Sequence, residues 1–586
     1  MYFISLSLLW LSCFLLLSPL LNNKNLKRNF SLAIVLIICS SLLITYMIKI
    51  FFYFNHINLE KNLFLSIYIF LSIILFFNNR KNYNFKIDLT KYGFILIILF
   101  LLTSLIVILN NSVSFTHWDS VVSWNRWANE LSKFEFNPAS ALYPILWPSI
   151  WSLIYELQLT SEYEFVAKSS LLIILVIFFF SIYFYSINVG YLPGLIFVIL
   201  LLINYNHTIE FLVSGYMDQP VSLLLLSALI LFSTLPYLVK KKYDLVLISS
   251  ATVISLSILT KQPALIIALF YFIFLFIQLL KKKINLNYFF SLNLILFVPY
   301  ILFLIFYLKT TGTETTYLSS LYKSNFLHYS EISIRDAILQ SSFLMNGVSR
   351  ILNEGGIFFL IILIFPIFFT YLIKNKELKI INYSLIGITL IGFIIYAKCC
   401  SYEIRNGYWL LGISICTSAN IFTRFVDKLT LGFLSKSLFS FRPFKTIMII
   451  NVIFFFMIFI PELKTGFIIN KHAIEKKKLG GEENAKLLKK DLDTLNGCFK
   501  VYAAHQLIKY NYHLKEYKEL IVRTSLDSLK KNFFKNYKID KCYIYFVFYD
   551  EIHNIENNKK ILRTIVERGG VRINKNIYKL PPNFIW

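Results

Sequence analysis

Charged residues are scarce in this sequence: they make up 15% of its 586 residues, whereas hydrophobic residues make up 57%. Together with a mean hydropathy of +0.64, this composition excludes a soluble globular chain. Acidic residues are the scarcer kind, with 32 Asp and Glu against 58 Lys and Arg. The sequence therefore predicts an α-helical polytopic membrane protein.

Cysteine is also sparse, and its seven copies form neither a Cys-x-x-Cys motif nor a Cys/His cluster. The spacing therefore suggests neither a zinc site nor an iron–sulfur site. Cys498 and Cys542 could form a disulfide in an oxidising compartment, or they could remain unpaired in a protein core. A sustained internal repeat is missing as well, which argues against a secondary transporter built from two related halves.

The net charge of +26 is carried largely by lysine in short loops beside the apolar stretches. Anionic lipid headgroups and orientation signals explain such loops better than nucleic acid does. We therefore expect membrane lipids as partners and no nucleic acid.

Apolar stretches long enough to cross a hydrocarbon core of roughly 30 Å predict about fourteen transmembrane helices. The first stretch lacks a basic n-region and a small-residue cleavage site, so we expect a retained span and not a signal peptide. The predicted spans lie near 2–21, 30–54, 60–77, 92–109, 164–187, 191–204, 220–238, 244–259, 264–280, 287–308, 356–373, 380–397, 408–423 and 446–461.

Basic residues gather in alternate loops, which are cytoplasmic by the positive-inside rule if both termini lie outside. These loops contain Lys24, Lys27 and Arg28; Arg80, Lys81 and Lys86; Lys240 to Lys242; Lys281 to Lys283; Lys374, Lys376 and Lys379; and the segment 424–445. The other hydrophilic loops, 110–163, 205–219, 309–355 and 398–407, then all face the extracytoplasmic side.

The composition changes near residue 461, which divides the chain into a transmembrane domain, 1–461, and a lysine-rich tail, 462–586. The tail mixes helical stretches (482–495 and 525–537) with β-type runs (541–549, 571–573 and 577–580). We expect the tail to form a small soluble α/β domain on the extracytoplasmic side.

Five of the eight tryptophans fall between Trp118 and Trp151, in a polar island between apolar stretches. If Trp118–Leu131 is an α-helix, one narrow sector holds Asp119, Ser123, Arg126 and Glu130, and the indoles share another. Such a helix could lie along the membrane surface with its charges facing a water-filled cavity, or it could be only an interfacial anchor. The prolines within Tyr143–Trp151 exclude one simple continuous helix there.

Three further polar segments interrupt the apolar runs on the same predicted side. Gly215–Pro220 contains Asp218, which could act on a ligand or simply cap the next helix. Thr260–Pro263 contains Lys261 and Gln262, and the lysine could meet a phosphate or snorkel to the interface. Ser401–Asn406 contains Arg405, whose guanidinium suits phosphate oxygens, and Glu403, which could pair with it.

An acidic residue in a long outer loop, preceded by apolar spans and followed by short aromatic helices, resembles the GT-C superfamily of polyprenyl-phosphate-sugar glycosyltransferases. It is similar above all to the branch that contains protein O-mannosyltransferases and the lipid A aminoarabinose transferase. Trp118-Asp119 stands at the position of the family's catalytic acid, and Gly215–Pro220 is similar to its Gly-Tyr-Ala-Asp-x-Pro segment. The family also has counterparts of Lys261 and Arg405.

The resemblance implies a membrane glycosyltransferase of the bacterial inner or cell membrane that acts in cell-envelope glycan biosynthesis. It would move a hexosyl or pentosyl group from a polyprenyl-phosphate donor to a hydroxyl of a lipid, glycan or protein acceptor, with inversion, on the extracytoplasmic side. In the catalytic loop, about 110–163, Asp119 would be the general base, and Lys261 with Arg405 would balance the leaving phosphate. The other substrate-binding candidates are His117, Trp118, Arg126, Tyr143, Asp218, Gln262 and Glu403.

No Asp-x-Asp pair surrounds Asp119, so we predict no required metal ion, although Asp218 could bring in a divalent cation. Three other functions remain open. An O-antigen polymerase or ligase would rely on arginines in large loops, and a transporter or flippase of lipid-linked sugars would place polar residues within its spans and on both faces. A structural or assembly protein would use the tail and leave the tryptophan-rich island as an anchor.

Overall fold

The computed structural model describes most of the helical part of the chain and the centre of its C-terminal part. The described residues are 30–54, 103–104, 107, 115, 119–136, 143–158, 164–210, 212–311, 342–397, 404–425, 482–495, 498–503, 520–522, 542–547, 563, 565–574 and 577–582. The chain forms two compact units. We call Met1–Phe115 with Trp124–Lys464 the helical unit, and Thr116–Ser123 with Thr465–Trp586 the sheet unit.

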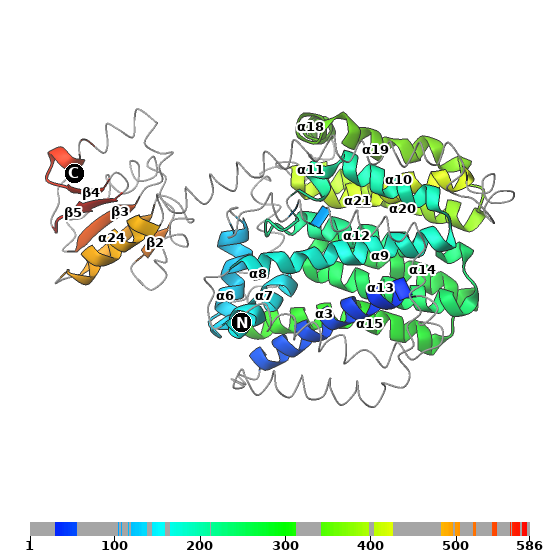
Figure 1. Cartoon of the computed structure of the whole chain (residues 1–586), viewed down its shortest axis with the longest axis horizontal. Helices are drawn as coiled ribbons and strands as arrows, with labels where there is room; N and C mark the ends of the chain where they lie inside the picture. The colour runs from blue at the N-terminus through cyan, green and yellow to red at the C-terminus, as the bar shows by residue number, and fades with distance from the viewer. Residues whose placement is uncertain are drawn as a thin grey trace. The chain divides into compact units, whose positions relative to one another are not determined.

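From Phe30 to Phe425, the described secondary structure is helical (Figure 1). Short π and 3₁₀ segments lie between several of these helices. In chain order the elements are α3 (Phe30–Phe54), η2 (Ser120–Asn125), α6 (Arg126–Ser132), α7 (Leu146–Gln158), α8 (Glu164–Ser169), η4 (Ser170–Leu172), α9 (Ile173–Asn188), α10 (Tyr191–Ile203), α11 (Tyr205–Thr208), α12 (Asp218–Ser233), η5 (Leu235–Tyr237), α13 (Lys240–Thr260), η6 (Gln262–Ala264), α14 (Leu265–Leu280), α15 (Leu286–Thr311), α18 (Ser342–Arg350), η7 (Ile351–Gly355), α19 (Gly356–Phe369), η8 (Thr370–Leu372), α20 (Lys376–Ile395), η10 (Ile404–Gly407), α21 (Tyr408–Ile421) and η11 (Phe422–Phe425).

Eight helices among the described residues are long and apolar enough to cross a membrane, so the protein is a multi-pass membrane protein. They are Ser31–Phe51, Val166–Asn188, Asp218–Tyr237, Lys242–Thr260, Gln262–Leu280, Leu286–Leu308, Gly347–Leu372 and Lys376–Ile395, and Tyr191–Ile203 is a shorter apolar helix. The predicted spans near 2–21, 60–77 and 446–461 lie outside the described residues, and that near 92–109 is described only at Thr103, Ser104 and Val107. The total of fourteen stays a prediction.

Helices α12 and α21 form the centre of the helical unit, and every residue of both is buried. Helix α12 packs against α9, α13 and α21. A Cβ atom at Gly412 would lie 2.7 Å from the Ser222 carbonyl oxygen, so only glycine permits this approach of α21 to α12. The Ser222 hydroxyl adds a 2.8 Å hydrogen bond to the carbonyl of Tyr408.

The outer helices, by contrast, expose large apolar side chains along their length. Examples are Leu269 and Ile273 on α14, Leu294 on α15, Phe358 on α19 and Ile391 on α20, each between 48% and 60% exposed. A surface of this kind is stable in hydrocarbon and not in water. These helices therefore provide the lipid-facing surface of the unit.

Lysine-rich loops meet at one end of the helical unit. Lys283, after α14, forms a 2.9 Å ion pair with Glu377 at the start of α20, and Lys242 on α13 donates to Asn188 at the end of α9. Helix α13 has 21 residues, and Lys261 follows its other end. At 1.5 Å per residue, Lys261 lies about 30 Å from this basic end.

After Thr465, the described elements of the sheet unit are α24 (Glu482–Asp493), β1 (Phe499–Ala503), β2 (Leu520–Val522), β3 (Tyr543–Val547), β4 (Val571–Asn574) and β5 (Ile577–Leu580). The strand order is β2-β1-β3-β5-β4. Strand β1 is parallel to β2 and β3, and β5 is antiparallel to β3 and β4. Strands β3, β4 and β5 coincide with the predicted β-type runs, and the predicted helix 525–537 lies outside the described residues.

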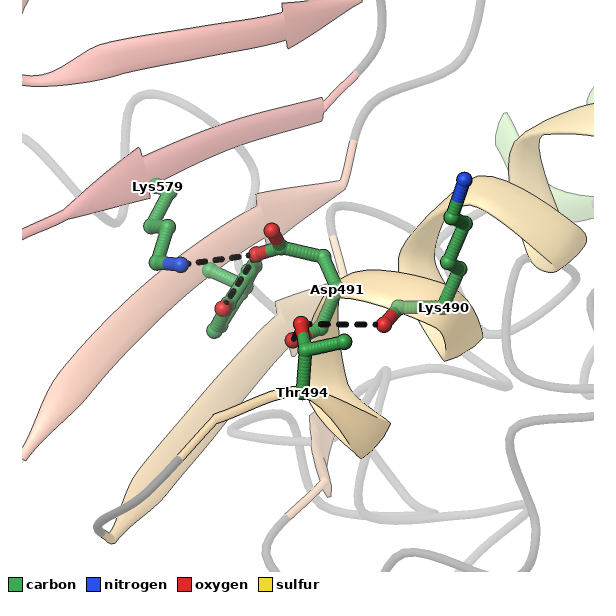
Figure 2. Close-up of polar contacts among 5 residues, drawn as sticks. Lys490, Asp491, Thr494 and Lys579 are labelled. Carbon is green, nitrogen blue, oxygen red and sulfur yellow. Dashed lines mark hydrogen bonds and ion pairs between the residues drawn. The ribbon is translucent and has the colours of Figure 1, made fainter.

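Two cross-links hold this unit together. A disulfide joins Cys498 and Cys542, just before β1 and β3. Asp491 on α24 accepts hydrogen bonds from Tyr545 on β3 at 2.6 Å and from Lys579 on β5 at 2.9 Å (Figure 2). Burial opposes ionisation of Asp491, but these two donors outweigh it and lower the pKa of the carboxyl group.

Candidate active site

An ion pair between Lys261 and Asp218 lies at the end of the helical unit opposite the lysine-rich loops. The Lys261 ammonium binds the Asp218 carboxylate, and the side chains are only 11% and 6% exposed. The lysine therefore does not snorkel to the interface, and the aspartate points to a partner on another helix instead of capping its own. Binding of a ligand by either residue stays a prediction.

The backbone conformation before α12 and after α13 brings the Asp218 and Lys261 side chains together. Gly215 has a φ of 92°, which favours glycine, and the turn it makes leads the chain into α12. Pro220 fits the first turn of α12, where the amide groups have no helical partner. Lys261 is extended, with a φ of −159°, so α13 ends and the ammonium group turns back toward α12.

Aromatic rings continue the site from Lys261. Its ammonium lies 5.5 Å from the centroid of the Tyr143 ring. Tyr143 stacks on Trp124 at 5.5 Å, and Trp124 meets Trp127 edge to face at 5.2 Å. Within the part of the chain that the structure describes, the Trp127 indole nitrogen has no hydrogen-bond partner. A buried donor in this state is suited to a polar ligand.

The tryptophan-rich segment differs from the continuous α-helix that its spacing predicts. Ser120–Asn125 is a π-helix, and the α-helix begins at Arg126. Because a π-helix bonds residue i to i+5, positions before Arg126 lose the α-helical alignment with those after it. Arg126 pairs with Glu130 at 3.4 Å.

The described tryptophans of this segment are buried against protein. Trp124 is 3% exposed and Trp127 is 2% exposed, so neither indole contributes to the lipid-facing surface, and the depth of the segment in the membrane stays a prediction. Trp147 donates to Thr260 and Trp151 to Ser170, each at 3.2 Å. The indoles therefore fix α7 against α13 and η4.

Arg405 lies at the same end of the unit. Its guanidinium carbon is 4.3 Å from the centroid of the Tyr216 ring, and Tyr216 is two residues before Asp218. The backbone amide of Ile404 donates to Glu354 at 3.4 Å, and Glu354 also pairs with Arg350. The short segment from Tyr216 to Asp218 thus contacts both cations proposed from the sequence.

His207 supports this arrangement from α11. Its Nε2 lies 3.0 Å from the Gly355 carbonyl oxygen and its Nδ1 lies 3.2 Å from the Tyr408 hydroxyl. A carbonyl only accepts, so Nε2 carries the proton and Nδ1 of the neutral ring accepts from Tyr408. Burial lowers the pKa of His207, opposed by the bond to Gly355, and keeps the ring neutral.

The remaining predicted site residues are placed as follows. Asp119 is half-buried directly before the π-helix and belongs to the sheet unit, whereas the Lys261 and Arg405 contacts belong to the helical unit. Gln262 begins η6, next to Lys261. His117, Trp118 and Glu403 lie outside the described residues, and their roles stay predictions.

Two partly buried carboxylates were missed by the sequence analysis. Glu156 on α7 pairs with Lys49 on α3, and this lysine is 3% exposed. Glu164 accepts from the Phe115 amide at 2.7 Å and from the Asn125 side chain at 2.8 Å. The sequence signal for Glu156 and for Glu164 was only the presence of an acidic residue beside apolar residues.

Across the described ranges, no group of three or more His, Cys, Asp and Glu side chains is placed to hold a metal ion. The divalent cation considered for Asp218 therefore stays a hypothesis without structural support in those ranges.

No protein-family model matches this chain, and no curated protein does. Among solved structures, the fold is similar to that of ArnT from Cupriavidus metallidurans in the apo state. The TM-score is 0.46 and the identity 12%, over 82% of this chain and 97% of that one. Similarity at this level assigns neither activity nor substrate, which we infer from the side chains.

Proposed function

We propose that this protein is an integral membrane glycosyltransferase of the GT-C type, which moves a sugar from a polyprenyl-phosphate donor to an acceptor hydroxyl. One observation carries the proposal: two cations, Lys261 and Arg405, meet the segment Tyr216–Asp218 at one end of a membrane-spanning bundle. A lipid-linked phosphate brings its anionic group to such a position and leaves its hydrocarbon chain beside the apolar outer helices.

The two cations suit the leaving group of this reaction. Cleavage of the bond between the anomeric carbon and the phosphate oxygen releases polyprenyl phosphate, which gains negative charge as it leaves. Such a group needs compensation by positive charge more than it needs a proton. Arg405 offers paired N–H donors, and Lys261 can exchange part of its contact with Asp218 for a phosphate oxygen.

Asp119 is the proposed general base. It would take the proton of the acceptor hydroxyl as that oxygen bonds to the anomeric carbon, and direct displacement would invert the configuration. The proposal for Asp119 rests on the position of Trp118-Asp119 in the sequence, which resembles that of the catalytic acid of GT-C enzymes.

Two observations support an extracytoplasmic site. The lysine-rich loops at the opposite end of α13 are cytoplasmic by the positive-inside rule. The disulfide Cys498–Cys542 requires an oxidising compartment, which supports an extracytoplasmic sheet unit. The proposed cell is bacterial, the acceptor is a lipid, glycan or protein of the cell envelope, and the sugar is a hexose or pentose.

Deletion of the gene and mass spectrometry of the envelope glycolipids and glycans test the function and identify the transferred sugar. We expect one species to lose the mass of a single sugar residue. Complementation with wild type should restore it, and Asp119→Asn should not, although its level in the membrane should be unchanged. Full restoration by Asp119→Asn would exclude the general-base role.

Binding of undecaprenyl phosphate, measured by native mass spectrometry on the purified protein, tests the cations separately. Arg405→Glu should weaken binding at least about tenfold, because it replaces attraction by repulsion. Arg568→Glu, a charge reversal at an exposed arginine of the sheet unit, is the matched control. Equal affinities for wild type and Arg405→Glu would remove the phosphate role of Arg405.

A further inference from the structure

Glu164 connects the two flanks of the segment that contains the proposed general base. Its Oε2 accepts the backbone amide of Phe115 at 2.7 Å, and its Oε1 accepts the side-chain amide of Asn125 at 2.8 Å. Asp119 is four residues after Phe115 and six before Asn125. One carboxylate therefore holds both ends of this short segment.

The surroundings of Glu164 fix its two partners in turn. The Asn125 side-chain oxygen accepts from the buried Tyr155 hydroxyl at 2.6 Å, so the orientation of its amide group is determined. The Phe115 ring packs on Trp151 at 4.8 Å. The buried ammonium of Lys168, one turn after Glu164 on α8, lies 5.6 Å from the centroid of the same ring.

We infer that Glu164 is a positioning residue, which holds Phe115 and Asn125 so that the segment between them presents Asp119 to the acceptor hydroxyl. This inference rests on the proposed function. Asn125 is the last residue of the π-helix Ser120–Asn125, and a π-helix is an uncommon turn that is frequent at functional sites. Glu164 on α8 binds both this last residue and the Phe115 amide, so it fixes the backbone on either side of Asp119.

The hydrogen-bond pattern permits a test in which the carboxylate of Glu164 and the amide of Asn125 change places. In Glu164→Gln the new amide nitrogen would face the amide nitrogen of Asn125, and two donors repel. In Asn125→Asp two carboxylates would face each other. In the double variant, the introduced glutamine amide would accept from Phe115 and donate to the introduced carboxylate, which would still accept from Tyr155. The double variant therefore restores every bond that the single variants lose.

Hydrogen exchange of the full-length protein in detergent measures the anchor directly. The Phe115 amide should exchange at least about tenfold faster in Glu164→Gln and in Asn125→Asp, and at the wild-type rate in the double variant. Glu377→Gln, at the lysine-rich end of the unit, is the matched control and should exchange as wild type at this amide. Unchanged exchange in Glu164→Gln would overturn the anchor, and failure of the double variant to recover would overturn the proposed geometry.

Product formation in the complemented deletion strain then tests the consequence for Asp119. Both single variants should make about 10- to 100-fold less product, the range expected for a displacement near 1 Å, and the double variant should recover. Undecaprenyl phosphate should bind all three as it binds wild type, because Lys261 and Arg405 are unaltered. Faster exchange with normal product formation would overturn the positioning role, whereas normal product formation in Asp119→Asn would overturn the proposed function alone.

Discussion

Lys261 and Asp218 form a buried ion pair that joins the end of α13 to the start of α12, although 43 residues separate them in the sequence. Breaking such a pair leaves an uncompensated charge in a region of low dielectric constant, whereas removing both charges does not. Loss of one partner should therefore lower the stability of the protein, and loss of Lys261 should also remove a proposed contact with the donor phosphate.

Removal of one partner should destabilise the protein strongly. We expect Asp218→Leu or Lys261→Met to lower the free energy of unfolding by about 3 to 5 kcal/mol, and the double variant to lose much less than the sum. Thermal unfolding in detergent measures this. The Lys283–Glu377 pair, with 45% and 59% exposed side chains, is the control, and its disruption should cost less than about 1 kcal/mol. Additive losses at Asp218 and Lys261 would contradict the coupling.

The indole nitrogen of Trp127, which has no partner among the described residues, should matter for substrate and not for stability. Trp127→Phe keeps an aromatic ring against Trp124 and removes only the N–H donor. Product formation in cells should fall by about tenfold, the effect of one lost hydrogen bond, at an unchanged unfolding temperature. Trp151→Phe should instead lower the unfolding temperature and leave product formation unchanged, because the Trp151 indole already donates to Ser170. Unaltered product formation in Trp127→Phe would show that this donor binds no substrate.

His207 should make the stability of the helical unit depend on pH. Its pKa is lowered from 6.5, so the neutral ring stabilises the fold fully above about pH 6.5, and this contribution is lost as the pH falls through the lower folded-state value. Protonation converts Nδ1 to a donor, which can no longer accept from Tyr408. Unfolding temperatures measured between pH 8 and pH 5 should fall in wild type and change less in His207→Gln. Equal slopes in the two proteins would exclude His207 as the source.

The disulfide Cys498–Cys542 should stabilise the sheet unit by constraining its unfolded chain. With a sequence separation of 44 residues between the two cysteines, loop-closure entropy predicts about 4 kcal/mol. Hydrogen exchange of β3 amides in the full-length protein should accelerate in Cys498→Ser/Cys542→Ser. Cys416→Ser, a change at a buried free cysteine of the helical unit, is the control and should leave these amides unchanged. Equal protection in both variants would argue against the disulfide as a stabilising element.

Asp491 should make the sheet unit acid-sensitive. Its lowered pKa means that its contribution to stability is present above about pH 3.8 and is lost as the pH falls through the folded-state value. Exchange of β3 and β5 amides should therefore accelerate in strong acid, and Asp491→Asn should already be accelerated at neutral pH with a weaker acid dependence. If wild type and Asp491→Asn respond to acid alike, the Tyr545 and Lys579 contacts do not control this stability.

Part of the candidate site could be predicted from residue type and position. Asp218, Lys261 and Arg405 interrupt apolar stretches at predicted helix ends, and the structure places all three at one end of the helical unit. Ion pairing of Lys261 with Asp218 could not be predicted, because it depends on which helices become neighbours. The same holds for Glu164, whose partners at Phe115 and Asn125 belong to another part of the chain.

Apolar length was a reliable guide to the long helices, whereas the α-helical period was a poor guide near the proposed general base. Long apolar stretches form helices such as α13 and α15 at the predicted positions, because a backbone in an apolar environment must satisfy its own hydrogen bonds. The segment Ser120–Asn125 forms a π-helix instead. Its tryptophan, Trp124, is 3% exposed and packs against Tyr143 and Trp127, contacts that the period does not predict.

The sequence by itself determined that this is a multi-pass membrane protein with its basic loops and its isolated polar segments at alternate helix ends. These properties sum over many residues, each of which contributes its own transfer free energy whatever its neighbours are. Only the tertiary structure decided which charges are paired, which indoles are buried and which carboxylate contacts Phe115 and Asn125. Such contacts join distant residues, and their geometry exists only once the helices have packed.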